Sequence, residues 1–572
     1  MPFIIVRMKT LRSIYKWCAN PRHLFFISLV VLILPNAALC VTERLSVMAS
    51  IANVLLPAGL YWLAMTMSRK PGKMIWALFL FIFLAAFQIV LLYLFGKGII
   101  AVDMFLNLVT TNPGEAMELL DNLVPGVAFV FIVYLPTLIL GVVSWRSKEK
   151  LDDAFLHNQR ICGGSVAAMG LLALATSYLT DKEYRAELQL YPANVIYNIY
   201  LAGERTYQTE HYADTSRGFS FHASKKGGKD EREIYVMVIG ETARACEFSI
   251  YGYHRPTTPL IEKEPNLVAF SNVMSQSNTT HKSVPMLLSA ASATDYDRIY
   301  REKGIIEAFR EAGFHTTFVS NQLPNHSFID FFGEEADDWM FIKEKSKEGA
   351  NTPDMAMVDI LNKVVAKNRK KEFIVLHSYG SHFNYRERYP RSAAFFRPDD
   401  ATEAKASNRA QLLNAYDNSI RYTDKFLASI IASLRKTGCT AAMLYTADHG
   451  ENIYDDERKL FLHASPTPSY YELHVPMLAW VSDMFNGERP DVLKTLLANR
   501  RKPVASSASM FHSMLGIAGI ATRCKADTLD ISSPRLHSAP RRYLNDHNKA
   551  LPLEKTGLSQ KDLQMIEAVG KK

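Results

Sequence analysis

Cysteine is scarce in this chain, with six residues in 572. Three lie in or beside long apolar stretches, and three lie beyond them: Cys246, Cys439 and Cys524. Three cysteines in the presumed soluble part allow at most one internal disulfide there. The sequence also has no CxxC pair and no Cys/His zinc-finger spacing. Any metal that the protein binds must therefore use oxygen and imidazole ligands.

A basic stripe is also missing. The formal charge of +8 and the pI near 8.9 could suggest nucleic acid. However, Lys and Arg do not gather in a stripe interleaved with exposed aromatic residues. Several instead flank apolar runs, a pattern typical of membrane orientation. We therefore expect a bilayer and no nucleic acid among the partners.

Five apolar runs, each near the roughly 20 residues that cross a bilayer, precede the soluble part. They cover residues 24–40, 47–67, 74–95, 124–145 and 161–180. A cleaved signal peptide is the alternative for the first run, but two more runs follow almost at once. Basic residues flank the runs on alternate sides, which predicts a cytoplasmic N-terminus and places everything after residue 180 outside the cytoplasm.

The composition divides the chain into four parts. We predict a transmembrane domain at 1–182, an interfacial helix and linker at 183–233, a soluble domain at 234–545 and a polar C-terminal tail at 546–572.

The loop near 103–120 is predicted to contain an interfacial helix. Asn107, Thr111 and Glu115 recur at four-residue intervals and would share one face if the helix continues through Pro113. Such a face is typical of a solvated helix and would also suit a lipid head group.

The soluble part alternates apolar β-rich runs with helix-like stretches, the pattern of an α/β doubly wound sheet. Predicted strands are 234–239, 267–273, 316–320, 373–377, 442–446 and 477–481, and predicted helices are 305–312, 354–368, 409–434 and 505–515.

Polar side chains follow three of these strands. Glu241 comes after the first, His377 and His382 come at the end of another, and Asp448 and His449 follow a third. Ligands bind at the carboxyl ends of the strands in such sheets, so these groups should share one rim. A lone histidine is more often structural, but carboxylates and imidazoles together suit zinc.

A hydroxyl group is expected at the same rim. The segment NTTHKSVP at 278–285 is a polar loop that leads into apolar residues. Free N–H groups at a helix start would attract a phosphate beside the hydroxyl. On these grounds alone, Thr279 and Thr280 are both candidate nucleophiles.

With these motifs in this order, the chain resembles the membrane-anchored phosphoethanolamine transferases. That family lies within the alkaline phosphatase and sulfatase superfamily, modifies lipopolysaccharide and includes the mobile colistin-resistance enzymes. The resemblance rests on the five apolar runs and on TNPGEA, VIGETARACEFSIYGYHRPTTP, NTTHKSVP, LHSYGSHFNYRERYP, and YTADHGEN followed by FLHASP. It implies a five-helix transmembrane domain in the bacterial inner membrane and a periplasmic α/β/α sandwich.

The resemblance also implies roles for individual residues. The Ser283-Val284-Pro285 that follows selects Thr280 as the nucleophile. A zinc ion would be bound by Glu241, Thr280, Asp448 and His449. His382 and His463 would hold the phosphoethanolamine group, transfer protons or bind a second zinc, with His377 as a weaker companion. The substrate-binding positions on the membrane side would be Asn107, Thr111 and Glu115.

The implied reaction has two steps. Phosphatidylethanolamine donates its head group to Thr280 and releases diacylglycerol, and an acceptor then attacks the phosphothreonine. Many lipid A-modifying relatives carry several disulfides for which this chain lacks cysteines. The acceptor on lipopolysaccharide, lipid A or a core sugar, therefore stays open, as does another periplasmic glycan. We expect a monomer.

Three other functions are compatible with parts of the pattern. A sulfatase would need a Cys or Ser nucleophile in a CxPxR-type motif, which is missing here. A phosphoglycerol transferase acting on a periplasmic glycan would use the same threonine and metal chemistry. A non-catalytic membrane protein could retain the fold without needing the zinc ligands.

Overall fold

The computed structural model describes residues 13, 15–110, 113–225, 231–345, 352–401, 403–537 and 540–571. Two units are distinguished within the chain. The first contains residues up to Val109 together with Leu119–Arg205, and the second contains Thr110–Glu118 together with Thr206–Lys572.

Helices make up the first unit. They are α2 Pro21–Thr42, α3 Val47–Met65, α4 Pro71–Ala77, α5 Phe79–Phe95, α6 Val102–Thr110, most of α7 Pro113–Arg146, α8 Asp153–Thr180, α9 Ala186–Gln189 and the larger part of α10 Ala193–Glu210.

Each predicted apolar run has a helical counterpart. Among the described residues, four helices are long and apolar enough to cross a membrane, and the number rises to five if α4 and α5 form one span bent by 64°. Helix α8 begins before the predicted run because Asp152 caps it, accepting a hydrogen bond from the Phe155 backbone N–H at 2.7 Å. The first turns of α8 are polar, so the apolar run in the sequence does not mark where the helix starts.

Small residues bring α3 and α8 into close contact. A Cβ atom built at Gly59 would lie 2.4 Å from the Ala167 nitrogen, and one at Gly170 would lie 2.4 Å from the Leu56 nitrogen. Such close backbone approach is the usual packing between membrane helices, where lipid tails remove the hydrophobic driving force.

The second unit is built around a seven-stranded sheet with the order β3-β11-β8-β2-β7-β5-β6. The strands are β3 Leu267–Phe270, β11 Met477–Val481, β8 Thr440–Ala447, β2 Glu233–Gly240, β7 Lys371–His377, β5 His315–Ser320 and β6 Asp338–Phe341. All are parallel from β8 to β6, and β11 runs antiparallel to both of its neighbours. Every residue of β2 and β8 is buried, as expected for central strands covered on both faces.

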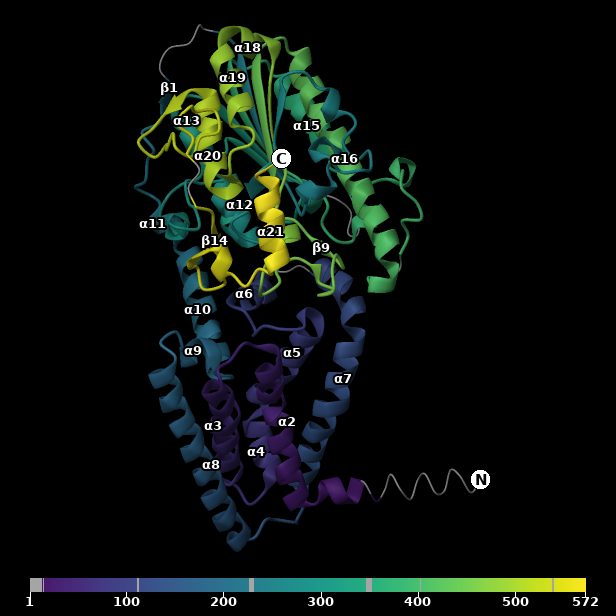
Figure 1. Ribbon diagram of the computed structural model, residues 1–572, viewed down its shortest axis with the longest axis vertical. Coiled ribbons are helices and arrows are strands. Elements are labelled where there is room, and N and C mark those ends of the chain that lie inside the picture. Colours follow the sequence, from purple (N-terminus) through teal and green to yellow (C-terminus); the bar gives the residue numbers. More distant parts are fainter. Residues whose placement is uncertain are drawn as a thin grey trace. The chain divides into compact units, whose positions relative to one another are not determined.

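Helices cover both faces of this sheet (Figure 1). One side carries α15 Met355–Val365 and α16 Arg409–Lys436, and the other carries α12 Thr280–Leu287, α13 Ile305–Glu311 and α20 Ser506–Ala518. The remaining helices are α11 Tyr212–Thr215, α14 Phe328–Gly333, α17 Tyr470–Leu473, α18 Asp483–Glu488, α19 Pro490–Asn499 and α21 Gln560–Val569.

Short strands occupy the loops around the sheet. They are β1 Ser224–Lys225 with β13 Ile520–Ala521, β4 Val273–Met274 with β12 Val504–Ala505, β9 Asn452–Ile453 with β10 Phe461–Leu462, and β14 Arg542–Leu544 with β15 Ala550–Pro552. The stretch 546–572, which the sequence marks only as polar, contains β15 and α21.

Each of the six predicted strands has a counterpart in the large sheet, and the four predicted helices are present. The predicted strand 267–273 is broken, because β3 ends at Phe270 and Val273 begins β4, which pairs with β12 in a separate sheet. The edge strand β6 was missed because its four residues begin with Asp338 and leave Trp339 exposed, so they lack the apolar run of a buried strand.

A buried histidine in α20 makes this fold sensitive to acid. His512 is 4% exposed, and its Nδ1 accepts a hydrogen bond from the Ala526 backbone N–H at 3.1 Å. Burial lowers the pKa of His512 to about 4. In the unfolded chain the His512 ring binds a proton near pH 6.5, whereas in the folded chain it does so only near pH 4. The free energy of unfolding therefore falls as the pH drops from about 6.5 to about 4.

His512→Asn should flatten this acid dependence, because an amide oxygen accepts the same hydrogen bond without titrating. The contribution removed is at most about 1.4 kcal/mol per pH unit. Thermal unfolding of the full chain in detergent between pH 4 and 6.5 measures it. The control is His254→Asn, an exposed position. Equal acid dependence in the two variants would contradict the prediction.

Candidate active site

The site begins where two central strands end side by side. Strands β2 and β8 are parallel and pair Gly240 with Ala447, and the Asp448 backbone N–H donates to the Gly240 carbonyl at 3.0 Å. The next residues, Glu241 on one strand and Asp448 on the other, are therefore neighbours at the carboxyl edge. Both are buried.

Thr242 links these two carboxylates from a left-handed backbone conformation, with φ at 58°. Its backbone N–H donates to Asp448 Oδ1 at 3.0 Å, and its hydroxyl donates to Glu241 Oε1 at 2.7 Å. A β-branched residue rarely adopts a positive φ, and such strain is concentrated at functional sites.

The nucleophile predicted from the sequence lies between Glu241 and His449. Thr280 is the first residue of α12, and its Oγ1 is 3.2 Å from Glu241 Oε1 and 3.0 Å from His449 Nε2. The hydroxyl of Thr279 instead lies 3.1 Å from that of Ser277. Of the two candidate threonines, the structure thus brings Thr280 to the carboxylates.

His449 presents a lone pair to this threonine. Its Nδ1 lies 2.9 Å from the Gly450 carbonyl, which can only accept, so Nδ1 carries the proton of the neutral ring. The other nitrogen, Nε2, is then an acceptor or a metal ligand. Burial lowers the pKa of His449 to about 3, and the nearby His463 adds to this effect, so the ring is neutral.

Glu241, Asp448 and His449 form a group that could hold a metal ion, with one ligand atom from each lying within 4.8 Å of the others. One observation supports this fit. Asp448 Oδ2 is buried and has no hydrogen-bond partner among the described residues, and an orphaned buried carboxylate oxygen is costly unless a cation binds it. With the Thr280 hydroxyl, the group offers the oxygen and nitrogen set of a four-coordinate zinc site.

The two carboxylates also need a positive charge. Burial raises the pKa of Glu241 to about 7, with Asp448 adding to the effect, and burial raises the pKa of Asp448 to about 6. Two adjacent buried carboxylates are unfavourable as anions unless a cation compensates them.

His463 and His382 complete the group of polar side chains at the carboxyl edge of the sheet, which we call the rim. The His463 ring lies 4.2 Å from the His449 ring and 5.9 Å from the His382 ring, measured between centroids. His463 Nδ1 is 3.2 Å from Glu451 Oε1. Burial lowers the pKa of His463, but Glu451, Glu241 and Asp448 outweigh burial and raise it to about 9.

His382 has the opposite character. Burial and the neighbouring His463 move its pKa well below the usual range. Its Nδ1 lies 2.6 Å from the Phe383 carbonyl, so Nδ1 carries the proton and Nε2 has the lone pair. A protonated and a neutral imidazole thus stand on the same rim.

His377 occupies a different position from the other predicted residues. It is fully buried, with Nδ1 3.2 Å from the Ser320 hydroxyl and Nε2 3.2 Å from the Gln322 amide nitrogen. The same amide nitrogen donates to Glu241 Oε2 at 3.0 Å. His377 is therefore linked to Glu241 through the Gln322 amide.

Gly380 allows the chain to approach the backbone of Glu241 closely. Its φ is +49°, and a Cβ atom there would lie 2.6 Å from the Glu241 carbonyl oxygen. The close approach lets the Ser381 backbone N–H donate to that oxygen at 2.9 Å.

The predicted membrane-side positions cannot be placed at the site. Thr111 lies outside the described residues, and Asn107 and Glu115 belong to α6 and α7 with side chains outside the described set.

Sequence reasoning missed Gln322 and Glu451 as functional residues. Gln322 follows the carboxyl end of β5, so the strand-end rule that found Glu241 could have found it. Glu451 stands next to the motif Asp448-His449-Gly450, but nothing in the sequence pairs it with His463.

Comparison with known proteins then decides the family. Residues 233–520, half of the chain, match the sulfatase family. The chain belongs to the sulfatase family. Its sulfatase-family region contains all the strands of the large sheet and every residue of the rim.

A curated relative is the Kdo(2)-lipid A phosphoethanolamine 7''-transferase of Salmonella typhimurium, which is 30% identical over 357 residues. The match covers 61% of this chain and 60% of the relative, so the chain spans less than two thirds of that protein.

Two solved structures share the fold. The integral membrane lipooligosaccharide phosphoethanolamine transferase A of Neisseria meningitidis has a TM-score of 0.70 and 21% identity, covering 90% of this chain and 98% of that one. The C-terminal periplasmic domain of EptC from Escherichia coli, in complex with Zn, has a TM-score of 0.55 and 22% identity, covering 61% and 98%. The predicted architecture, apolar helices followed by a sulfatase-like α/β domain, is confirmed.

Removing one carboxylate should weaken metal binding at this group. Glu241→Gln or Asp448→Asn should lower the zinc bound per chain, because each change removes one anionic ligand from the predicted zinc site. Elemental analysis of purified full chain measures the zinc. Asp424→Asn is the control, a buried carboxylate that accepts from the Leu260 and Ile261 backbone N–H groups. Equal zinc in all variants would place the metal elsewhere.

Proposed function

We propose that this protein is a zinc-dependent phosphoethanolamine transferase of the bacterial inner membrane. It takes the head group of phosphatidylethanolamine and passes it to lipopolysaccharide through a phosphothreonine at Thr280. The observation that carries the proposal is the Thr280 hydroxyl at 3.2 Å from Glu241 and 3.0 Å from His449. The similarity to a lipid A phosphoethanolamine transferase supports the choice of donor and acceptor.

Glu241, Thr280, Asp448 and His449 would hold the zinc ion. When bound, zinc lowers the pKa of a coordinated hydroxyl and offsets charge on phosphoryl oxygens. The chain itself positions the hydroxyl at the start of α12, where backbone N–H groups favour the phosphate.

Before the first step, the Thr280 hydroxyl would lose its proton to solvent, since a bound zinc would lower its pKa. The alkoxide oxygen then attacks phosphorus, and the bond between phosphorus and the diacylglycerol oxygen breaks. The leaving oxygen needs a proton. His463 suits this task because Glu451, at 3.2 Å, stabilises its protonated form.

In the second step, an acceptor group attacks the phosphothreonine and the Thr280 oxygen leaves. Where the acceptor is a hydroxyl, it must lose a proton. His382 suits this task because its Nδ1 donates to the Phe383 carbonyl and leaves Nε2 as a base.

The membrane places the lipid donor beside the enzyme. The four or five apolar helices would anchor the chain with its N-terminus in the cytoplasm and the sulfatase-family domain in the periplasm. Asn107, Thr111 and Glu115 are proposed to contact the donor head group, with the Glu115 carboxylate suited to its ammonium.

Incubating the full chain with phosphatidylethanolamine should add one phosphoethanolamine group to Thr280. Thr280→Ala should lower turnover by at least about a thousandfold, the scale seen when a catalytic nucleophile is lost. Peptide mass spectrometry locates the adduct, and Thr279→Ala is the matched control. Modification from phosphatidylglycerol instead would favour a phosphoglycerol transferase. Unchanged lipid turnover by Thr280→Ala would defeat the proposal.

Cells that express the protein should carry lipopolysaccharide heavier by one phosphoethanolamine unit. Mass spectra of separated lipid A and core locate the acceptor, which also tests exposure of the domain to the periplasm. Cells expressing Thr280→Ala are the control. An unmodified lipopolysaccharide together with a modified periplasmic glycan would shift the acceptor away from lipopolysaccharide.

A further inference from the structure

Two loops that carry proposed catalytic groups are joined at Asn278, two residues before Thr280. The Asn278 carbonyl accepts from the Ala464 backbone N–H at 3.1 Å. Its Nδ2 donates to the Ser465 carbonyl at 3.0 Å and to Glu472 Oε1 at 2.8 Å. The residues adjoining His463 are thus bonded directly to the nucleophile loop.

Glu472 strengthens this junction from a fully buried position. Besides Asn278, its carboxylate accepts from the Ser465 backbone N–H at 3.2 Å and hydroxyl at 2.8 Å, and from the Ser469 backbone N–H at 2.8 Å. Both carboxylate oxygens accept hydrogen bonds, so Glu472 holds Ser465 and Ser469 of the segment that follows His463.

The C-terminal part of the chain reaches the same junction. The Tyr543 hydroxyl of β14 donates to Asn278 Oδ1 at 2.7 Å. The Leu544 backbone N–H donates to the Gln276 carbonyl, also at 2.7 Å. Tyr543 lies beyond residue 520, where the match to the sulfatase family ends. A residue outside the family region therefore orients the amide that positions the nucleophile loop.

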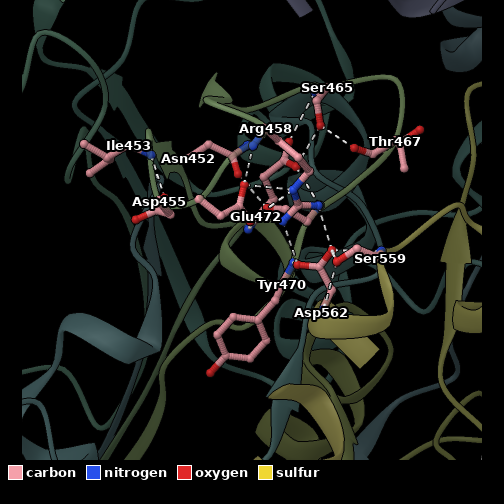
Figure 2. Close-up of polar contacts among 12 residues, drawn as sticks. Asn452, Ile453, Asp455, Arg458, Ser465, Thr467, Tyr470, Glu472, Ser559 and Asp562 are labelled. Carbon is pink, nitrogen blue, oxygen red and sulfur yellow. Dashed lines mark hydrogen bonds and ion pairs between the residues drawn. The ribbon is translucent and has the colours of Figure 1, made fainter. Parts of the chain in front are cut away.

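A second contact comes from α21 (Figure 2). Asp562 receives two hydrogen bonds from Arg458, at 2.7 and 3.0 Å, and one from the Tyr470 backbone N–H at 3.1 Å. Arg458 lies between β9 and β10, and Tyr470 begins α17. One carboxylate thus ties together two points of the chain that lie on either side of His463.

The loop that carries His463 has little regular structure to hold it. Between Ile453 and Tyr470 the structure has only the two residues of β10, Phe461–Leu462. Besides the direct contact of His463 with Glu451, the hydrogen bonds made by Asn278, Glu472 and Asp562 hold this loop in place. Misplacing a catalytic group by about 1 Å can cost a hundredfold in rate.

We propose that the C-terminal segment 542–569 is a positioning element of the active site, which sets the place of His463 relative to Thr280 through Tyr543 and Asp562. These two residues touch neither substrate nor metal and act through Asn278 and Arg458. The effect that we expect on the reaction rate rests on the proposed function.

The kinetic test compares Tyr543→Phe and Asp562→Asn with Glu567→Gln in the full chain. Glu567 is a control on the same helix, because its ion pair with Lys571 is exposed. We expect kcat for phosphatidylethanolamine to fall on the order of tenfold in the first two variants, while KM stays within about twofold. A misplaced catalytic group weakens binding of the transition state more than binding of the substrate. Asp562→Glu should recover part of the rate. Rates equal to those of Glu567→Gln would overturn the proposal.

Hydrogen exchange separates this proposal from the proposed function. In Asp562→Asn, peptides covering 453–470 should exchange about tenfold faster than in Glu567→Gln, because a charged hydrogen-bond pair is lost. Peptides from β2 and β8 should not change. This exchange result does not depend on catalysis. If the wild-type chain left phosphatidylethanolamine intact, only the proposed function would be defeated. Unchanged exchange at 453–470 would defeat the positioning role.

Discussion

The parallel pairing of β2 with β8 is the constraint on which the site depends. Because Gly240 lies opposite Ala447, the next residues of both strands leave the sheet at the same point. Glu241 and Asp448 are thereby held together in a buried place where two carboxylates would repel each other without a cation. The energy of a large buried sheet keeps them there, and this is how a fold can maintain a locally unfavourable arrangement of charge.

Hydrogen bonds rather than covalent links hold the loops around this point. All six cysteines are among the described residues and all are free thiols. The nucleophile loop is instead bonded through Asn278 to the segment that carries His463, and Asp562 reaches that segment from α21. Such bonds are directional and buried, so a conservative substitution can displace a loop without unfolding the sheet.

Much of the site was predictable because its chemistry follows strand ends. The runs before Glu241 and Asp448 are continuous and apolar, which marks buried parallel strands, and ligands collect at their carboxyl edge. The choice of Thr280 over Thr279 came only from family resemblance, and the helix start at Thr280 gives its physical reason. Gln322 and the Glu451–His463 pair were missed because each joins segments that are distant in sequence or lack a motif.

The apolar helices, the α/β alternation and the charged residues at the strand ends could be read from the sequence, because local periodicity and composition govern each of these. The three-dimensional structure was needed to show that β11 runs antiparallel, that His377 lies behind Gln322 and that the polar C-terminus reaches the nucleophile loop. These depend on contacts between residues far apart in the chain, and no local pattern encodes them. The stretch 278–280 illustrates both parts, since the sequence supplies the Thr280 hydroxyl, while Tyr543 and Glu472 bind the Asn278 side chain in the same loop.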